Sequence, residues 1–394
     1  MPIVDINQED ANRICLLVNQ SIETTQDLTS LDLGEYTHLK NEIYQIINSN
    51  RAYLGQMDVN AKSPLVWGFY KDVLEKVNQY GCQILRLDAF AYLHKKVGES
   101  NFFNKPGTWD YLARINEIAK NNNLLLLPEI HAEYSLHLHD KVAKKGYVIY
   151  DFFLPGLTIH TIEKSNSKAL INWAKEIISK GYKTVNMLGC HDGIPVLDLM
   201  GKEVNGVYYK GLLEDAEIEE MMALLLARGG RVKNLYGADG NKISYYQVNA
   251  PFFSALGESE QKLLLARAIQ LFMPGTPQIW YLDIFAGSND HEAADDAGQG
   301  GHKEINRTAL SLENIEAGLK KEVVLQQLEL IRLRNTSKAF WGIPSFQESS
   351  DSLINITWTH KEQYAQLEAD LKTHEFSARY SENGEQKCID YNIG

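Results

Sequence analysis

The sequence predicts an α/β protein with a parallel sheet of the (β/α)8 TIM-barrel type and a C-terminal antiparallel β domain. First, short and nearly continuous apolar runs alternate with helical segments, a pattern typical of parallel strands covered by helices on both faces. Second, near residue 340 the pattern changes to alternating apolar and polar residues, which is typical of antiparallel strands with one face in solvent. We therefore expect a helical segment at 1–60, a barrel domain at 61–338 with an excursion at about 193–255, and a β domain at 339–394.

The N-terminal part of the chain has a mainly helical pattern. Helices are expected around Asp10–Gln20 and Glu35–Asn50, with at most one strand, near Ile3–Ile6. The next helix begins at Ser63-Pro64, because a capping hydroxyl followed by proline in the first turn is a favoured helix start. We expect it to end at Gly81.

Five apolar runs downstream of this helix have the length and boundaries of buried parallel strands. The predicted strands are Gln83–Phe90, Leu124–Ile130, Tyr147–Leu154, Thr184–Leu188 and Gln278–Phe285. The helices expected with them begin at Pro106 and cover about 106–121, Ile159–Ser179, Asp215–Arg228, Ser259–Phe272 and Ala317–Asn335. In the C-terminal domain, strands are expected at Ser352–Trp358 and Tyr364–Leu371, with a hairpin turn at Ser381–Gly384.

Composition excludes several classes of protein. Hydrophobic residues make up 44% and charged residues 23%, as in an ordinary globular protein, and no apolar run is long enough for a membrane span. The net charge of −12, with both signs intermixed, disfavours nucleic acid and anionic membranes as partners. The N-terminus shows no secretory signal, and the four cysteines are far apart, so we expect reduced thiols in a cytoplasmic protein.

Three of the apolar strand segments end on an acidic residue, namely Asp88, Glu129 and Asp192. In a barrel of this type, active-site groups lie at the C-terminal ends of strands. Glycoside chemistry needs two carboxyl groups at one glycosidic bond, one with a raised pKa and one ionised, and a third carboxylate can bind sugar hydroxyls. Each acid taken alone is more often a helix cap or a loop residue, but the three together indicate a site.

Arg86 lies two residues before Asp88, so the alternation of side chains along a strand places both on one face. A permanent positive charge there would keep Asp88 ionised, as a nucleophile requires. The alternative is a purely structural ion pair, and both interpretations can hold at once.

Three segments resemble, in order, conserved regions of the α-amylase superfamily (glycoside hydrolase family 13), most closely its sucrose phosphorylase branch. They are Arg86–Tyr92 (RLDAFAY), Pro128–His131 (PEIH) and Cys190–Ile194 (CHDGI). The supporting segments are 150–152, 246–249, 266–270, 274–278 and 305–307. The resemblance implies that Asp88 forms a β-glucosyl-enzyme, that Glu129 is the general acid/base and that Asp192 stabilises the transition state.

The same resemblance implies binding roles for further residues, besides Arg86. Tyr92 and His131 match residues near the phosphate or acceptor, His191 and Arg307 match the glucosyl pocket and its rim, and Gln247 matches a glutamine of a mobile loop. It also implies a sucrose-like α-glucoside as substrate, inorganic phosphate as co-substrate, no metal or organic cofactor, and a homodimer as a possible assembly.

The chain departs from the family upstream of Asp88. The family carries three barrel strands, a small inserted domain and an Asp-x-x-x-Asn-His region there, none of which is readable, and the single upstream histidine, His38, follows Thr37. About 60 residues cannot hold three βα units. We therefore expect only strands 4–8 of the barrel, in an open sheet whose first strand is covered by N-terminal helices or left bare.

The acceptor is left open by the sequence. Where the sucrose-specific pattern reads Asp-Leu-Tyr-Gln, this chain has Ser244–Gln247 (SYYQ), and sucrose 6′-phosphate enzymes tend to have histidine at the position of Tyr246. Tyr246 therefore favours an unphosphorylated acceptor, while the missing aspartate weakens the case for fructose. The functional alternatives are hydrolysis or transglucosylation by the same triad, or a catalytically inactive truncated remnant.

Two other signals are weaker. His131, His137, His139 and Asp140 form a cluster that suggests a metal, but solvated loop positions are the preferred interpretation. The glycine-rich run Gly298–Lys303 lacks the frame of a phosphate-binding loop. We expect this run to be a long barrel loop near the mouth of the site, because Arg307 follows it.

Overall fold

The computed structural model describes residues 6–25, 28–49, 59–95, 102–236, 242–298, 301–347, 350–382 and 384–391. The chain divides into two compact units, Met1–Cys82 with Ala91–Leu124, and Gln83–Phe90 with Leu125–Gly394. Each unit is described by itself. The domain boundaries expected from the sequence stay predictions.

The first unit is helical. Helices α1 (Gln8–Thr25) and α2 (Lys40–Ser49) enclose a small core of Ile14, Leu31, Leu33 and Ile43. Two short 3-10 helices, η1 (Leu28–Ser30) and η2 (Gly34–Leu39), connect them, so the helix expected from Glu35 becomes α-helical only at Lys40. The predicted strand near Ile3 lies outside the described residues except for Ile6, which is not in a strand.

Helices α3 (Pro64–Gln79) and α4 (Gly107–Asn121) complete this unit and confirm the predicted starts. The Ser63 hydroxyl accepts a hydrogen bond from the Leu65 N–H, with Pro64 at the first helical position. This is the expected cap, because a helix begins with N–H groups that have no partner within the helix.

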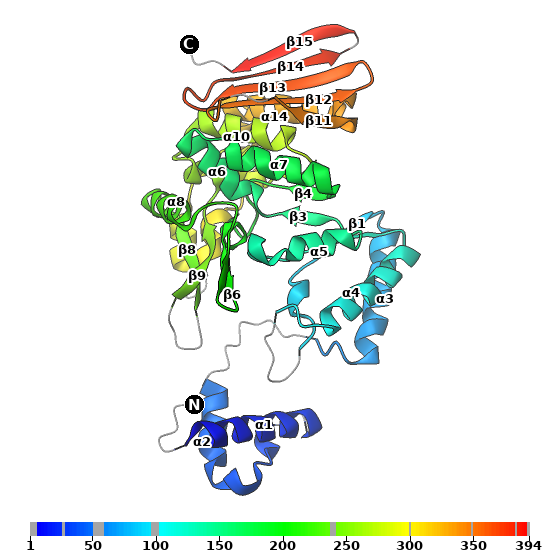
Figure 1. Ribbon diagram of the computed structural model, residues 1–394, viewed down its shortest axis with the longest axis vertical. Coiled ribbons are helices and arrows are strands. Elements are labelled where there is room, and N and C mark those ends of the chain that lie inside the picture. The colour runs from blue at the N-terminus through cyan, green and yellow to red at the C-terminus, as the bar shows by residue number, and fades with distance from the viewer. Residues whose placement is uncertain are drawn as a thin grey trace. The chain divides into compact units, whose positions relative to one another are not determined.

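The second unit contains five short parallel strands, of which β1, β3 and β4 are labelled in Figure 1. They are β1 (Ile84–Leu87), β2 (Leu125–Pro128), β3 (Ile149–Asp151), β4 (Thr184–Asn186) and β10 (Thr276–Pro277). β1 pairs with β2, β4 pairs with both β3 and β10, and β2 contacts β3. The register aligns Leu87 with Pro128, and Asp151 with Asn186, so the C-terminal ends of these strands share one edge. Within the described residues the strands do not close into a barrel, as the sequence predicts.

Two strand predictions need correction. The predicted strand 147–154 ends at Asp151, because the Asp151 carboxylate accepts the Leu154 N–H and α6 (Leu154–Lys164) begins there. The prediction of a strand at 278–285 is wrong. The observed strand, β10, ends just before this range, and residues Tyr281–Ile284 form helix α11. An apolar run of this length does not by itself distinguish a strand from a buried helix.

The predicted helix 159–179 is two helices, α6 and α7 (Lys168–Lys180). The break is at Ser165, which has a positive φ of 50° and ends α6. A left-handed residue cannot continue an α-helix, so the chain turns there.

The excursion after β4 holds further short strands of this unit. Strand β5 (Ile194–Pro195) pairs antiparallel with β9 (Lys242–Asn249), which pairs with β8 (Arg231–Tyr236). A separate hairpin joins β6 (Lys202–Val204) and β7 (Val207–Tyr209), and helix α8 (Asp215–Ala227) follows as predicted.

The C-terminal strands form one antiparallel sheet in sequence order. They are β11 (Ile343–Phe346), β12 (Leu353–His360), β13 (Gln363–Asp370), β14 (Phe376–Glu382) and β15 (Glu385–Tyr391). This sheet lies against α10 (Glu260–Phe272) and α14 (Glu322–Thr336) in Figure 1, and the Trp358 indole donates to the Phe272 carbonyl oxygen at 2.7 Å. The predicted hairpin turn includes Asn383, which lies outside the described residues.

The other helices in the described part of the chain are short. They are η3 (Phe90–Tyr92), η4 (Tyr134–Leu136), α5 (Leu138–Lys144), η5 (Leu197–Leu199), α9 (Phe252–Ala255), α12 (His291–Asp296), η6 (Gly301–Asn306), α13 (Leu312–Gly318) and η7 (Lys338–Trp341).

The sequence suggests solvated loop positions for the histidine cluster after β2. This interpretation is wrong for Asp140 and His139. Asp140 is buried in α5, and His139 packs among Tyr134, Phe153 and Trp173, where burial lowers the pKa of His139 to about 4. Only His137 is exposed. Among the described residues, no group of histidine, cysteine and acidic side chains has the arrangement of a metal site.

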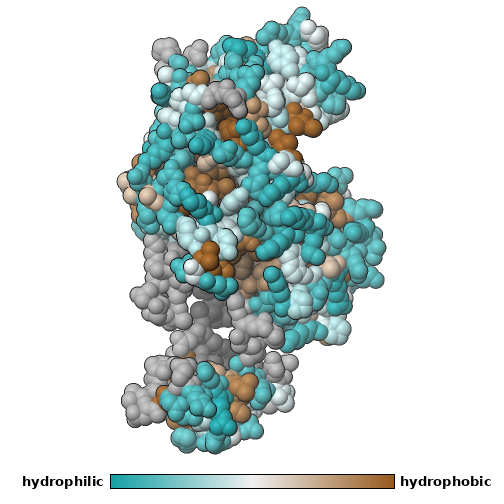
Figure 2. All heavy atoms as spheres, viewed as in Figure 1, coloured by the Kyte–Doolittle hydropathy of each residue, from teal (hydrophilic) through white to brown (hydrophobic). Residues whose placement is uncertain are grey.

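The surface is mainly polar. The face drawn in Figure 2 is predominantly hydrophilic, with hydrophobic side chains in small separate patches. No helix in the described part of the chain combines the length and apolar character that crossing a membrane requires. All four cysteines are free thiols.

Candidate active site

The site begins where β1 and β2 end side by side. The Arg86 guanidinium binds Asp88 Oδ1 through NH1 at 2.7 Å and Glu129 Oε2 through NH2 at 2.6 Å. Arg86 and Asp88 therefore share one face, as the alternation along β1 predicts. The Asp88 side chain is 69% exposed and that of Glu129 only 12%. One cation thus holds two carboxylates of unequal burial at the ends of adjacent parallel strands.

The turn after β1 supports this arrangement. Ala89 has a φ of 46°, in the left-handed region that residues with a Cβ atom rarely occupy. In this conformation the Ala89 N–H donates to Glu129 Oε2 at 3.3 Å. Unfavourable backbone geometry is common beside reactive groups, where the surrounding structure enforces it.

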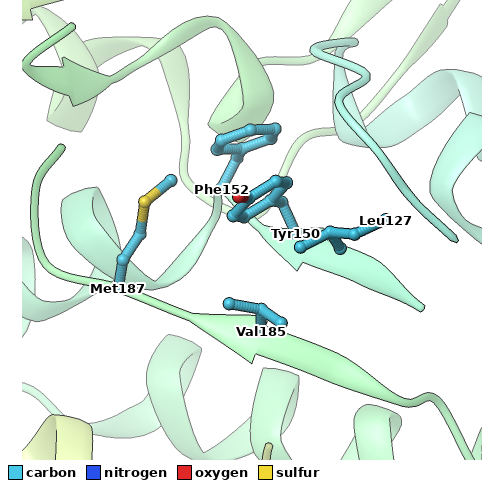
Figure 3. Close-up of a cluster of buried hydrophobic side chains, with 5 residues drawn as sticks. All are labelled: Leu127, Tyr150, Phe152, Val185 and Met187. Atoms are coloured by element: carbon cyan, nitrogen blue, oxygen red, sulfur yellow. The ribbon is translucent and has the colours of Figure 1, made fainter. Parts of the chain in front are cut away.

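A cavity of about 200 Å³ lies beside these groups. Its lining includes Arg86, Glu129 and His191 from the predicted site, and also Tyr150, Phe152, Met187, Cys190 and Gln278. Figure 3 shows that Tyr150, Phe152 and Met187 belong to the apolar cluster over β3 and β4 that also contains Leu127 and Val185. The cavity therefore joins carboxylate chemistry to a rigid apolar base, the usual form of a small-molecule site.

Glu129 is ionised in this arrangement. Burial favours the neutral acid, but the neighbouring His131 ring and the charge of Arg86 outweigh burial and lower the pKa of Glu129 to about 2. The sequence-based expectation that one catalytic carboxyl has a raised pKa is therefore not met while Arg86 binds Glu129.

His131 lies between two carboxylates. Its Nε2 is 3.7 Å from Glu129 Oε1, and its Nδ1 is 3.1 Å from Oδ2 of Asp198, a buried residue of η5. The ring stacks on Phe152 with a centroid distance of 3.7 Å and meets Tyr246 edge-on at 5.6 Å. Burial disfavours the charged ring, but Asp198 and Glu129 outweigh burial and raise the pKa of His131 to about 9.

Asp192 forms a second group of contacts, beyond β4. Its Oδ1 accepts from Lys303 Nζ at 2.6 Å and from Arg307 NH2 at 3.1 Å, and His191 Nε2 lies 3.5 Å away. Burial alone would raise the pKa of Asp192, but the hydrogen bond and charge of Lys303, with the charge of His191, lower it. Asp192 is therefore a carboxylate held by cations.

The backbone around Asp192 is fixed by β9. Gln247 and Asn249 donate their side-chain amides to the Asp192 carbonyl oxygen at 2.8 and 2.6 Å. Gly193 has a φ of 106°, and a Cβ atom there would overlap the Val248 carbonyl oxygen. Only glycine therefore lets the turn approach β9 this closely.

The structure brings nearly all the predicted site residues together in the second unit. Arg86, Asp88, Glu129, His131 and Tyr246 are connected by the contacts above, as are His191, Asp192, Gln247 and Arg307. Tyr92 belongs to the other unit, where its ring lies 5.4 Å from that of Phe102.

Besides the residues that line the cavity, three polar residues that contact predicted site residues were not predicted from the sequence: Asp198, Asn249 and Lys303. Asp198 has a signal, because it is a charged residue inside the apolar run 194–199. Lys303 ends the glycine-rich run that the sequence places near the mouth of the site. Asn249 lies on the same face of β9 as Gln247, two residues earlier.

Comparison with known proteins finds relatives that match most of this chain. A sucrose 6(F)-phosphate phosphorylase of Ilumatobacter coccineus is 56% identical over 354 residues, which cover 89% of this chain and 67% of the relative. A sucrose phosphorylase of Streptococcus mutans is 34% identical over 331 residues, covering 83% and 65%. The chain thus spans about two thirds of the length of these relatives. No family model matches the sequence.

Solved structures show the same similarity. Sucrose 6F-phosphate phosphorylase from Thermoanaerobacter thermosaccharolyticum matches with a TM-score of 0.75 and 33% identity, over 84% of this chain and 65% of that one. An α-amylase from H. orenii matches with a TM-score of 0.53 and 15% identity, over 83% and 59%, which shows the fold alone. These matches confirm the (β/α)8-barrel type of fold.

Proposed function

Because the chain belongs to the sucrose phosphorylase family of the α-amylase superfamily, we propose that it transfers a glucosyl group from a sucrose-like α-glucoside to inorganic phosphate. The observation that carries this proposal is the binding of Asp88 and Glu129 to one guanidinium at the ends of adjacent parallel strands. Such an arrangement is compatible with the separation of about 5–5.5 Å between the two carboxyl groups of retaining glycosidases.

In the first step, Asp88 attacks the anomeric carbon of the glucosyl group while Glu129 gives a proton to the departing oxygen. The bond to the aglycone breaks as the ester bond to Asp88 forms, with inversion. Glu129 must be protonated here, so the substrate has to displace the Arg86 guanidinium from Glu129 and separate the carboxylate from the His131 ring, because both groups lower its pKa. Arg86 then remains paired with Asp88, the attacking carboxylate.

In the second step, a phosphate oxygen attacks the anomeric carbon and Asp88 leaves as a carboxylate. Glu129 takes the proton that phosphate loses, and the second inversion yields α-glucose 1-phosphate. Asp192 stabilises the positive charge that develops on the sugar ring in both steps. Lys303 and Arg307 keep it anionic, as this role requires.

These carboxylates supply the nucleophile, the acid and the base, so we propose that the reaction uses no metal or organic cofactor. Inorganic phosphate is the co-substrate. The cytoplasmic location and the homodimer stay predictions from the sequence.

The test is to incubate the purified chain with sucrose or sucrose 6F-phosphate, with and without inorganic phosphate. We expect α-glucose 1-phosphate to form only with phosphate, and Tyr246 predicts the higher rate with unphosphorylated sucrose. Release of free glucose at a rate independent of phosphate would show a hydrolase instead. A strong preference for sucrose 6F-phosphate would contradict the prediction from Tyr246 but not the reaction class.

A further inference from the structure

The acceptor side of the site contains a buried carboxylate to which the proposed mechanism gives no role. Asp198 lies in η5, and its side chain is 2% exposed. Its Oδ2 is 3.1 Å from His131 Nδ1, and its Oδ1 accepts the Ala132 N–H at 3.3 Å. Both carboxylate oxygens of Asp198 therefore contact the segment that follows Glu129.

These contacts fix the His131 ring. Nδ1 must carry a proton, because the Asp198 carboxylate accepts a hydrogen bond there. The stack on Phe152 and the edge contact with Tyr246 restrain the plane of the ring. Nε2 is thereby directed toward Glu129 Oε1, at 3.7 Å.

The arrangement matters for the second step of the proposed reaction. Phosphate is an anion, and it must approach the ionised carboxylate of Glu129, which repels it. A cationic His131 beside Glu129 offsets that repulsion, since a charge at this distance acts strongly in a site partly shielded from water. Water, the competing acceptor, has no charge and gains little from such a cation.

We propose that Asp198 is a positioning residue that holds His131 as a cation aimed at the acceptor side of Glu129, and so favours phosphate over water. This inference rests on the proposed function for its catalytic consequence but not for its structural part. The charged or titratable groups facing His131 are Asp198, Glu129 and Tyr246, with Arg86 on the other oxygen of Glu129.

The sign of the pH dependence follows from the raised pKa of His131, about 9. Below that pH the ring is charged, and above it the cation is lost. Asp198→Asn removes the negative charge but keeps an oxygen acceptor of the same shape. The pKa of His131 should then fall by at least about one unit, which is tenfold in the protonation equilibrium. The alkaline limb of phosphorolysis should shift to lower pH by the same amount.

The matched control is Asp140→Asn. Asp140 is also buried, but it lies in α5, and its partners among the described residues, Tyr182, Lys144 and Lys180, are not residues of the site. A general effect of losing a buried aspartate would appear in both variants. An effect through His131 appears in Asp198→Asn alone.

The experiment has two arms. In the first, NMR follows the imidazole of His131 across pH, assigned by the signal missing in His131→Gln. We expect a mainly charged ring at pH 8 in the parent chain and in Asp140→Asn, and a ring at most half charged in Asp198→Asn. In the second, kinetics give the KM for inorganic phosphate and the ratio of glucose 1-phosphate to glucose. We expect KM to rise, and the ratio to fall, on the order of tenfold in Asp198→Asn alone.

The outcomes separate this inference from the proposed function. A His131 that is neutral at pH 7 in the parent chain overturns the inference, even if Asp198→Asn does not fold. An unchanged ratio in a folded Asp198→Asn variant also overturns it and leaves the proposed function intact. If the parent chain makes no glucose 1-phosphate, the proposed function fails, while the titration of His131 still decides whether Asp198 holds the ring as a cation.

Discussion

At the scale of single residues, the site is a row of alternating charges. The row runs Asp88, Arg86, Glu129, His131, Asp198, with successive contacts of 2.7, 2.6, 3.7 and 3.1 Å. Partly buried charges are tolerated only when each is paired, and removing one leaves its neighbour uncompensated. The exposed end of the row, Asp88, is free to react because only one partner, Arg86, binds its carboxylate among the contacts described above.

Asp88→Asn tests the nucleophile. We expect a loss of turnover of at least about a thousandfold, because an amide cannot form the glucosyl ester and no neighbouring group replaces it. The folded structure should be retained, because the side chain is 69% exposed and its loss buries no unpaired group. Formation of glucose 1-phosphate and the circular dichroism spectrum measure the two effects.

Asp351→Asn serves as the control for Asp88→Asn. Asp351 is exposed in the turn before β12, and its backbone carbonyl accepts the Ser167 N–H at 2.7 Å. The activity of the Asp351→Asn variant should equal that of the parent chain. Loss of soluble protein in Asp88→Asn, with Asp351→Asn unaffected, would mean that the pair with Arg86 is structural.

How far the sequence predicts these residues depends on how local their contacts are. Arg86 and Asp88 are two residues apart, so the alternation along a strand is enough to place them together. Asp198 is 67 residues from His131, and no local pattern announces a contact over that separation. The low pKa of Glu129 could not be predicted from the sequence either, because it depends on Arg86 and His131 lying at different oxygens of the Glu129 carboxylate in the folded chain.

At the scale of elements, local chemistry predicts starts better than ends. The Ser63-Pro64 start of α3 and the Ser259 cap of α10 are where the sequence predicts them, because each depends on a side chain next to its own backbone. The prediction of a strand at 278–285 is wrong because apolar residues of this run form helix α11. There the buried Asp283 accepts the Phe252 N–H, a tertiary contact that periodicity does not reveal.

Gly193→Ala tests whether the turn before β5 sets the position of Asp192. A Cβ atom would overlap the Val248 carbonyl oxygen, so β5 must separate from β9 and the bonds of Gln247 and Asn249 to the Asp192 carbonyl must lengthen. We expect a stability loss of about 2–4 kcal/mol, measured by urea unfolding, and a marked loss of activity.

Gly206→Ala is the control for Gly193→Ala. Gly206 also has a positive φ, 78°, but nothing lies within 4 Å of the added carbon. The Gly206→Ala variant should lose only about 1 kcal/mol of unfolding free energy, which is the cost of the backbone conformation alone, and it should keep its activity. Equal losses in the two variants would show that the close approach to β9 is unimportant.

At the scale of the whole molecule, the parallel sheet is unevenly supported. β4 is paired on both sides, by β3 and β10, and Val185 at its centre is buried. β1 has a strand partner on one side only among the described residues, and Ile84 at its start is half exposed. Yet β1 carries Arg86 and leads into Asp88, so the reactive end of the site stands on the less supported strand.

This difference predicts uneven amide hydrogen exchange. Opening a strand that is paired on one side and partly exposed breaks fewer contacts than opening one buried between two neighbours, so its amides exchange faster. We expect peptides covering 83–90 to exchange at least about tenfold faster than those covering 182–188. β2, which pairs with β1 and contacts β3, should be intermediate. Mass spectrometry of the exchanging chain measures all three.

Exchange in β1 as slow as in β4 would contradict the prediction and show that the outer edge of β1 is covered. Repeating the measurement at tenfold dilution would then distinguish a second copy of the chain from a segment of the same chain.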